Sequence, residues 1–454
     1  MRRSGLALLV ASSLLLSAAQ AATRPHYGGT LRVAMAAAPG SLDPLELNQS
    51  GSLAGRNLSH LLFDTLVTLD DRGRPLPALA VSWQADPGNQ RWQFQLRRGA
   101  TFQDGTAVTA EQVASSLRVA NPSWRVLATG DTVVIERDSP SPELAPELAL
   151  ARNGIAKRGG TKLFGTGPFV ITTWEPGKKL RLAASNEYWG GRPFVDSVEI
   201  EMGQGFREQM LALDLGRADL IEVAPEQAHR AAAEGRRVES SAPVELMALI
   251  FARDAQSTED IRLRQALSFA IDRQALNSVL LQGGGEPTGA LLPNWMTGYA
   301  FLFSTNADLA QANQVRSQLR QASPWTLSYD ASDPVERVLA ERIALNARDA
   351  GLQLQLTNSA TADLRLVRIP IASLDRRVAL TTLEAAVGVP LSTLSADSAE
   401  DFYSAERLLL ESRRVIPLLH ARVSFGVSGT VRNWSEGPGG GWRLPDVWLG
   451  AGKP

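Results

Sequence analysis

Apolar and polar positions along the chain follow both the two-residue period of strands and the 3.6-residue period of helices. Strands are predicted where apolar residues alternate or run together: 31–36, 92–96, 131–137, 169–174, 180–184, 198–202, 246–251, 325–329, 352–356, 364–369 and 416–427. Helices are predicted where apolar residues recur on one face: 52–67, 110–117, 206–215, 261–271, 273–282, 334–350 and 401–414. Because the two kinds of element are interspersed, the sequence predicts an α/β fold.

Several residues mark the ends of these elements. Thr109 and Gln112 have the spacing of a capping box, and Asp272 is placed to cap the helix that follows it. Gly216 follows a helical segment, where a left-handed glycine commonly ends a helix. The Pro176-Gly177 pair lies between two predicted strands and indicates a hairpin with a type II turn.

The length of the chain suggests more than one domain. Its 454 residues are enough for two or three domains. No internal period of 20–50 residues and no low-complexity linker divides the chain. We therefore expect domains that share strands and are joined by several crossings of the backbone.

The first 21 residues have the pattern of a secretory signal peptide. Arg2 and Arg3 precede an apolar stretch at 6–16, and Ala19-Gln20-Ala21 follows as a cleavage site. The apolar stretch is about half as long as the ~20 residues that span a bilayer, so we expect no retained anchor. A buried N-terminal helix is the alternative, but no polar face interrupts the run. The sequence predicts a soluble, exported protein.

Charge and cysteine content exclude several classes of protein. The 46 Lys and Arg residues balance the 47 Asp and Glu residues, and the formal net charge of −1 argues against nucleic-acid binding. The chain contains no cysteine. This excludes disulfides, thiolate metal sites, cysteine nucleophiles and attachment through a lipidated cysteine.

No residue pattern recommends an enzyme. The four histidines, at positions 26, 60, 229 and 420, are too far apart for a zinc-binding His-x-x-x-His pair. The chain has neither a Gly-x-Ser-x-Gly nucleophile elbow nor a complete phosphate-binding loop. We expect no catalytic residue, no metal and no cofactor, and an exported enzyme stays as an open alternative.

The tryptophans are candidates for ligand contacts. Ten are present, and Trp124, Trp295, Trp325 and Trp434 lie near breaks between predicted elements. At such positions an aromatic side chain can project into a cleft. Packing in a core is the ordinary alternative for each of them.

Eight short segments in chain order carry a resemblance to a known family: GGTL at 28–31 with SLDP at 41–44, LFDTLV at 62–67, PALAVSW at 77–83, WQFQLR at 92–97, FQDGT at 102–106, GTGPF at 165–169, NEYWGG at 186–191 and RQALSFAIDR at 264–273. In this order they resemble the family 5 extracellular solute-binding proteins, the dipeptide-, oligopeptide- and nickel-binding components of ABC importers. DVWL at 446–449 looks like the closing strand of that family.

The resemblance implies a two-lobed, venus-flytrap fold of the type II periplasmic binding proteins, with mixed sheets. Lobe 1 is expected at 22–255 plus 424–454, with a small subdomain inserted at about 46–160, and lobe 2 at 256–423. The two crossings are expected near residues 253 and 424. The implied function is that of a monomeric periplasmic receptor, which encloses a small, most simply peptide-like, solute and delivers it to an ABC permease in the inner membrane.

The second lobe departs from the family pattern. Members carry an aromatic and acidic stretch whose aspartate can pair with the amino terminus of a peptide, and the interval 373–398 lacks it here. The chain is also shorter than typical members by tens of residues. A non-transport sensor or assembly protein with a degenerate cleft is therefore a second hypothesis.

Five residues are expected at the ligand site. Asn48, Gln49 and Ser50, and likewise His420, are placed there by rough family position. Trp124 is placed there because it follows a break in the pattern. A surface loop for the first three residues and a buried strand end for His420 are the alternative interpretations.

Overall fold

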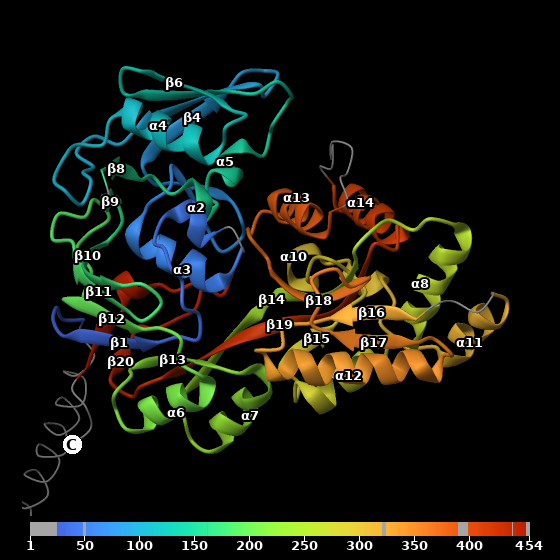
Figure 1. Ribbon diagram of the computed structural model, residues 1–454. Helices are drawn as coiled ribbons and strands as arrows, with labels where there is room; N and C mark the ends of the chain where they lie inside the picture. Colours follow the sequence, from blue (N-terminus) through green and yellow to red (C-terminus); the bar gives the residue numbers. More distant parts are fainter. Residues whose placement is uncertain are drawn as a thin grey trace, which may run out of the picture.

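The computed structural model describes residues 25–48, 51–160, 162–319, 324–388, 398–437 and 439–450 (Figure 1). The predicted signal peptide at 1–21 lies outside these residues. The described chain is a mixed α/β protein in which one large sheet extends through two lobes. None of the described helices is both long and apolar enough to cross a membrane.

The large sheet mixes parallel and antiparallel pairs. β1 pairs in parallel with β12 and β13, whereas β14 pairs antiparallel with both β18 and β19. In spatial order its strands are β10 (Phe169–Glu175), β11 (Lys179–Ala184), β12 (Ser197–Glu201), β1 (Thr30–Ala34), β13 (Leu220–Val223), β19 (Val415–Val427), β14 (Val238–Phe251), β18 (Leu364–Pro370), β16 (Trp325–Ser328) and β17 (Leu354–Thr357), with β15 (Gly285–Pro287) beside β19.

Two long strands, β14 and β19, pass from one lobe into the other. They pair from Val238 opposite Gly426 at one end to Ile250 opposite Val415 at the other. In Figure 1 they run diagonally through the middle of the molecule. The ladder is irregular between Ser240 and Glu245, where the register shifts twice. The expectation of domains that share strands is therefore confirmed.

The first lobe packs around a core of β1, β10, β11, β12 and α3, in which Leu31, Leu62, Phe169 and Ile200 are almost fully buried. The C-terminal segment returns to this core through Trp442. In the first lobe, α3 spans Leu53–Leu62. The other elements of this lobe are α2 (Pro44–Leu47), β8 (Lys157–Gly159), β9 (Lys162–Phe164), α6 (Phe206–Asp214), α7 (Pro225–Ala233), β20 (Val431–Arg432), the 3₁₀-helix η5 (Leu444–Asp446) and β21 (Trp448–Leu449).

A small subdomain of the first lobe has its own core, whose residues run from Leu66 to Ile155. Its sheet has the order β4-β5-β7-β6, and α4 packs against it (upper left in Figure 1). The elements are β2 (Val67–Leu69), β3 (Pro75–Pro77), β4 (Ala80–Ala85), β5 (Arg91–Leu96), α4 (Ala110–Ala120), β6 (Arg125–Thr129), β7 (Thr132–Glu136), α5 (Leu144–Glu147) and the 3₁₀-helix η2 (Ala151–Asn153).

The second lobe buries both faces of its part of the sheet. Met247, Leu249 and Phe251 of β14 face one core, and the alternate residues Leu246 and Ala248 face another. The apolar run at 246–251 therefore forms a strand buried on both faces, as predicted. The helices of this lobe are α8 (Thr258–Ala270), α9 (Arg273–Ala275), the π-helix η3 (Leu276–Leu280), α10 (Asn294–Thr297), the 3₁₀-helix η4 (Ala300–Leu302), α11 (Leu309–Ser317), α12 (Pro334–Asp349), α13 (Arg376–Val387) and α14 (Ala399–Glu411).

The predicted helix caps and glycine turns that depend on neighbouring residues are confirmed. Thr109 and Gln112 form the capping box of α4, and the Asp272 side chain accepts from the backbone N–H of Ala275. Gly216 and Gly177 both have positive φ. The residue boundaries of the lobes, 22–255 with 424–454 and 256–423, stay a prediction.

Two helix predictions were right in place but wrong in extent or type. The helix predicted over 52–67 ends at Leu62, because Phe63 is extended and the chain turns toward a distant partner. The segment 273–282 is only a three-residue α-helix followed by the π-helix η3. In addition, α13 lies in an interval where no element was predicted, although Asp375 caps its start and Gly388 ends it with a positive φ.

Three of the sequence motifs meet at the turn after α3. The carboxylate of Asp64 accepts from Tyr188 Oη and Trp189 Nε1, both at 2.8 Å, and its backbone N–H donates to Thr166 Oγ1 at 3.0 Å. Burial raises the pKa of this carboxyl to about 6. These motif residues therefore hold the scaffold together, and nothing in their geometry points to a ligand.

Gly165 provides a test of this close packing. A Cβ added there would lie 1.8 Å from the Leu62 carbonyl oxygen. We expect Gly165→Ala to lower the free energy of unfolding by about 3 kcal/mol, because backbone on both sides has to shift. Urea unfolding followed by tryptophan fluorescence measures this change. Gly429→Ala, whose Cβ meets no atom within 4 Å, is the control and should stay within about 0.5 kcal/mol of the parent; equal effects of the two substitutions would contradict the packing.

Candidate functional site

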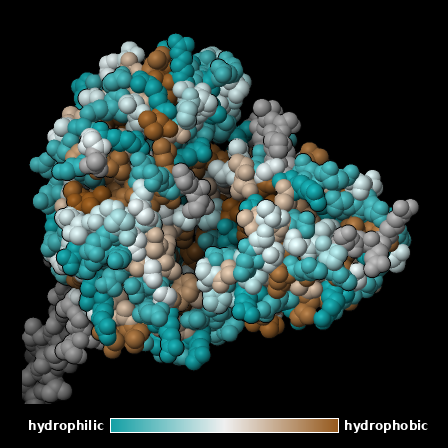
Figure 2. All heavy atoms as spheres, viewed as in Figure 1, coloured by the Kyte–Doolittle hydropathy of each residue, from teal (hydrophilic) through white to brown (hydrophobic). Residues whose placement is uncertain are grey.

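A cavity of about 500 Å³ lies between the lobes, beside the crossing strands. The first lobe contributes β13 and the beginnings of α3, α6 and α7, and the second lobe contributes the end of β18 and the start of α12. β14 and β19 complete the wall with Glu245 and with residues 422–425. The face drawn in Figure 2 is hollowed between the two lobes. We call this space the acidic cavity, because carboxylates predominate among its charged groups.

Five carboxylates and two guanidinium groups line the acidic cavity. The carboxylates come from both lobes and from a crossing strand, and the guanidinium groups come from β18 and β19. The carboxylates are Glu222, Glu245, Asp330, Asp333 and Glu336, and the guanidinium groups are Arg368 and Arg422. The cavity therefore carries an excess of negative charge.

Glu222 is the carboxylate that the first lobe contributes to the acidic cavity. It interrupts the apolar strand β13, between the buried residues Ile221 and Val223. Because successive side chains of a strand point to opposite faces, this position turns the carboxylate away from the core beneath Ile221. Its Oε2 accepts from the backbone N–H of Ala36 at 2.7 Å. Burial raises the pKa of the Glu222 carboxyl, and the charge of Glu245 adds to the shift.

Arg368 joins two of the other carboxylates. Its Nη2 lies 2.5 Å from Oε2 of Glu245, and its Nη1 lies 3.2 Å from Oδ2 of Asp333. Asp333 also caps α12, because its Oδ1 accepts from the backbone N–H groups of Val335 and Glu336. These charges raise the pKa of Arg368, so its own positive charge is committed within the protein.

Glu336 lies in the first turn of α12 and is only 5% exposed. Its Oε2 accepts from the backbone N–H of Asp330 at 2.8 Å. Burial raises the pKa of its carboxyl to about 6; the charges of Asp333 and Asp330 raise it further, and Arg368 opposes them. Within the described residues, neither Glu336 nor Glu222 forms an ion pair with Lys or Arg.

A second cavity between the lobes, of about 370 Å³, adjoins the first at Arg368 and Pro370. No carboxylate lines it, and its three charged residues are Arg56, Arg152 and Arg368. Its remaining wall is mostly apolar and includes Leu150 and several alanines of α13 and the preceding loop. We call it the arginine-lined cavity. Arg368 is paired with Glu245 and Asp333, and Arg152 with Glu147. Among the described residues, Arg56 is therefore the charged group of this cavity without an ion pair.

Arg56 of α3 connects the lobes directly. Its Nη1 donates to the carbonyl oxygen of Ile371 in the second lobe at 2.6 Å, and its Nη2 donates to that of Gly439 at 3.1 Å. Its Nε has no hydrogen-bond partner. Burial lowers the pKa of Arg56 to about 10, so the guanidinium stays charged at neutral pH.

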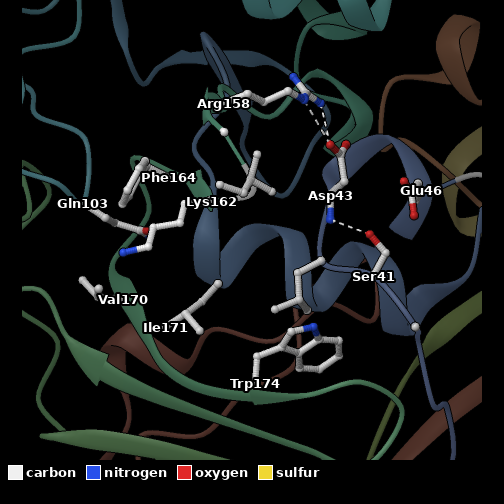
Figure 3. Close-up of a pocket in the computed structure, with 14 residues that line it drawn as sticks. Ser41, Asp43, Glu46, Gln103, Arg158, Lys162, Phe164, Val170, Ile171 and Trp174 are labelled. Carbon is white, nitrogen blue, oxygen red and sulfur yellow. Dashed lines mark hydrogen bonds and ion pairs between the residues drawn. The ribbon is translucent and has the colours of Figure 1, made fainter.

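A further cavity, of about 650 Å³, lies within the first lobe and is drawn in Figure 3. Arg158 and Asp43 form an ion pair at its rim, with Nη2 and Oδ2 2.6 Å apart. The Trp174 side chain lies across its opposite side, near Ile171 (Figure 3). Because only one lobe lines this cavity, it cannot change with the angle between the lobes.

The structure places the predicted site residues in different environments. Asn48 lines the arginine-lined cavity, and its Nδ2 donates to Pro44 O and Ser59 Oγ. Gln49 and Ser50 lie outside the described residues. Trp124 is 7% exposed in the core of the small subdomain, with the Arg137 guanidinium 5.2 Å from its ring. A ligand role for these residues stays a prediction.

His420 is buried within β19. It is 2% exposed, its Nε2 lies 2.9 Å from the carbonyl oxygen of Leu291, and burial lowers its pKa to about 4. The imidazole is therefore neutral at ordinary pH, and its ligand role stays a prediction. Among the described residues, no three His, Asp or Glu side chains are grouped so that they could hold a metal ion.

The charged residues of the cleft were not singled out from the sequence. Glu222 and Glu245 each interrupt an apolar strand, which was a usable signal, since a charge in such a strand has to find a partner or a cavity. Glu336 and Arg368 carried no such signal. Glu336 is an ordinary acidic residue at a helix start. Arg368 lies within β18, a strand that already contains another arginine, Arg365.

Comparison with known proteins places the chain among solute-binding proteins. The model described as "Bacterial extracellular solute-binding proteins, family 5 Middle" matches residues 74–378. The chain is 26% identical over 339 residues to Protein XP55 of Streptomyces lividans, which covers 66% of this chain and 62% of XP55. It is 26% identical over 414 residues to "Probable di/tripeptide-binding protein 5" of Pseudomonas aeruginosa, which covers 78% of this chain and 76% of the relative. The chain thus spans less than two thirds of the length of XP55.

The fold is also that of a solved structure. The oligopeptide-binding protein AppA from Bacillus subtilis, in complex with a nonapeptide, superposes with a TM-score of 0.80 at 16% identity, covering 94% of this chain and all of AppA. This similarity confirms the two-lobed fold of periplasmic binding proteins that the sequence motifs implied.

The shifted pKa of Glu336 predicts a pH-dependent effect of its substitution. The pKa of about 6 in the folded protein lies above the ordinary value of a glutamate, 4.5. The charged carboxylate therefore destabilises the folded protein above pH 6, and this destabilisation is absent below pH 4.5. Glu336→Gln removes the charge and keeps an acceptor for Asp330. We expect it to raise the free energy of unfolding by about 2 kcal/mol at pH 8 and by less than half of that at pH 5.

Urea unfolding at the two pH values measures this difference. Glu341→Gln is the control, because Glu341 lies on the same helix and is half exposed beside Arg337. The interpretation is wrong if Glu336→Gln has the same effect at both pH values.

Proposed function

Because the chain belongs to the bacterial extracellular solute-binding proteins of family 5, we propose that it is the periplasmic substrate-binding component of an ABC transporter. It encloses a small, peptide-like solute between its lobes and presents the closed form to a permease in the inner membrane. The observation that carries this proposal is a cleft lined by both lobes and by the two strands that cross between them. A solute in this cleft contacts both lobes and therefore stabilises the closed form relative to the open one.

The peptide-like solute is proposed from the relatives. One relative is named a di/tripeptide-binding protein, and the AppA structure holds a nonapeptide. The two adjoining cavities, of about 500 and 370 Å³, are of the size of small-molecule sites. The proposal further includes a monomeric, exported protein without a lipid anchor, with no catalytic activity and no nucleic-acid partner.

We place the hinge within the crossing strands. The ladder between β14 and β19 is irregular from Ser240 to Glu245 and again between Met247 and Ala248. The second irregularity lies in the cores of the second lobe, where residues after Glu245 pack, and this leaves the first for the hinge. Irregular backbone has fewer hydrogen bonds to break when it bends, which favours this segment as the hinge. The first crossing then lies nearer to residue 243 than to residue 253, and the second near residues 421–424.

A sensor or assembly protein with a degenerate cleft is the second candidate. It is favoured by the interval 373–398 after β18, which lacks the aromatic and acidic stretch that the family resemblance implies. The two candidates differ in whether the cleft still closes on a solute.

Ligand screening with the mature protein distinguishes the candidates. We expect one or more members of a set of di- and tripeptides to raise the melting temperature and to bind in calorimetry. A peptide at 100 times its Kd should stabilise the folded protein by about 2.7 kcal/mol. The absence of binding across the peptides, and across sugars and metal chelates, would contradict the receptor and favour the second candidate. Turnover of an added compound would favour an enzyme.

Arg56 should control the lifetime of the closed form. Arg56→Met removes the donors to Ile371 O and Gly439 O, and hydrogen bonds from charged groups contribute about 1.5–3 kcal/mol each. We expect peptide dissociation to accelerate about tenfold or more, with the association rate within roughly twofold of the parent. Stopped-flow tryptophan fluorescence measures both rates. Arg342→Met, at an exposed position of α12, is the control, and an unchanged dissociation rate in Arg56→Met would contradict the role.

A further inference from the structure

We propose that the hairpin of β2 and β3, residues 67–77, is a closure latch: Gly73 at its tip contacts the backbone of Leu374 in the second lobe and holds part of the protein closed before any solute binds. The inference rests on the proposed function only because it concerns the closing of the same two lobes. Neither Gly73 nor Leu374 is among the residues that line the acidic cavity or the arginine-lined cavity. The contact therefore needs no solute.

The two lobes approach each other closely at Gly73. A Cβ added there would lie 2.4 Å from the carbonyl oxygen and 2.7 Å from the carbonyl carbon of Leu374, and 3.0 Å from the backbone nitrogen of Asp375. Two backbones approach in this way only where one of them carries no side chain. Gly73 also has a φ of +77°, which L side chains rarely adopt. A glycine at the tip thus lets the hairpin touch the second lobe, and a side chain there would keep the two apart.

The hairpin is held firmly on the first lobe. Its turn is closed by Asp70, whose Oδ1 accepts from the backbone N–H groups of Arg72 and Arg74, both at 2.9 Å. The neighbouring Asp71 is tied to the C-terminal segment of this lobe, because its Oδ1 lies 2.5 Å from Nη2 of Arg443. The tip therefore moves together with the first lobe.

The segment that meets the hairpin is held equally firmly on the second lobe. The backbone N–H of Ile371 donates to the carbonyl oxygen of Val244 in β14 at 2.7 Å. The backbone N–H of Asp375 donates to Ser373 Oγ at 3.1 Å, and Asp375 Oδ1 caps α13 by accepting from the N–H of Val378. Figure 1 shows the chain entering α13 on the side of the second lobe that faces the first. Because both backbones are held, the contact at the hairpin tip depends on the angle between the lobes.

A second contact from the first lobe reaches the same segment. Arg56 Nη1 donates to the carbonyl oxygen of Ile371 at 2.6 Å, three residues before Leu374. Other residues of this segment line the arginine-lined cavity: Ile369, Pro370 and Ala372. The segment thus faces the cleft with some residues and touches the first lobe with others. A solute and the latch therefore stabilise the same closed form, and the latch does so without the solute.

The latch sets how much of the protein is closed before a solute arrives, and this affects both rates of exchange. A form that protein contacts alone hold closed admits no solute until the lobes open, and it retains a solute that is already inside. Without the latch the lobes open more often. Dissociation should then become faster, and association should not become slower.

Gly73→Ala tests the latch, with Gly99→Ala as the matched control. Gly99 lies in the same subdomain and has a φ of +82°, and its added Cβ meets no atom within 4 Å. Both substitutions therefore strain the backbone alike, and only Gly73→Ala adds a contact between the lobes. Spin labels at two exposed positions, Val119→Cys of α4 and Leu408→Cys of α14, report the distance between the lobes by electron–electron double resonance without any ligand.

We expect the parent to show a short-distance component without solute. Gly73→Ala should reduce this component at least about fivefold, and Gly99→Ala should keep it. A parent without the component, or equal distributions in the two variants, would overturn the latch. A Gly73→Ala protein that unfolds at lower urea concentration than Gly99→Ala but keeps the parent's distribution would also overturn it, because the contact would then be structural only.

Stopped-flow fluorescence with trialanine separates the latch from the receptor function. Dissociation should accelerate at least about fivefold in Gly73→Ala, with an association rate no lower than that of Gly99→Ala. If trialanine does not bind, the distance measurement still decides, and a reduced short-distance component supports the latch while the peptide assignment fails. If trialanine binds and leaves both variants with equal dissociation rates and equal distributions, the latch is overturned and the receptor function stands.

Discussion

The antiparallel pairing of β14 with β19 is the contact on which the rest of the structure depends. It carries one sheet from the first lobe into the second, so neither lobe is an independent unit connected by a loose linker. The pairing also brings Glu245 next to the cleft and holds β18, with Arg368, at a fixed register beside it. The ladder is irregular between Ser240 and Glu245, and this segment of the two strands that unite the lobes is where we propose the hinge.

The electrostatics of the cleft follow from that arrangement. Charges that lie on β13, β14, β18 and α12 would be separate surface features if the lobes were apart, and the crossing strands gather them around one cavity. Arg368 neutralises two of the carboxylates, and the remaining ones keep an unbalanced negative charge beside the hinge. Three guanidinium groups line the adjoining part of the cleft.

Sequence reasoning succeeded where the cause of a structure is local. The capping box at Thr109, the left-handed Gly216 and the doubly buried strand at 246–251 depend on residues within a few positions, and all three are present. The early end of α3 could not be predicted, because it depends on Asp64 meeting Tyr188 and Trp189, more than 120 positions away.

The site could not be predicted from the sequence either, because its residues are distant from one another along the chain. Glu222 and Glu336 are 114 positions apart in the sequence, and only the strand order places them around one cavity. The family motifs gave the fold because they reflect turns and packing, but they contain none of these charged residues. The interval in which the family resemblance implies an aspartate anchor holds α13 instead, whose small side chains line the arginine-lined cavity.

The central claim is that the two lobes close on a solute, and a distance between the lobes tests it most directly. The chain has no cysteine, so Val119→Cys on α4 and Leu408→Cys on α14, both at exposed positions, can carry the only two spin labels. Electron–electron double resonance then reports the distance distribution with and without a bound peptide. If the lobes close on the solute, the distribution is broad without peptide, and it narrows and shifts to shorter distance when the peptide binds. A distribution that does not change while calorimetry shows the peptide bound would contradict it.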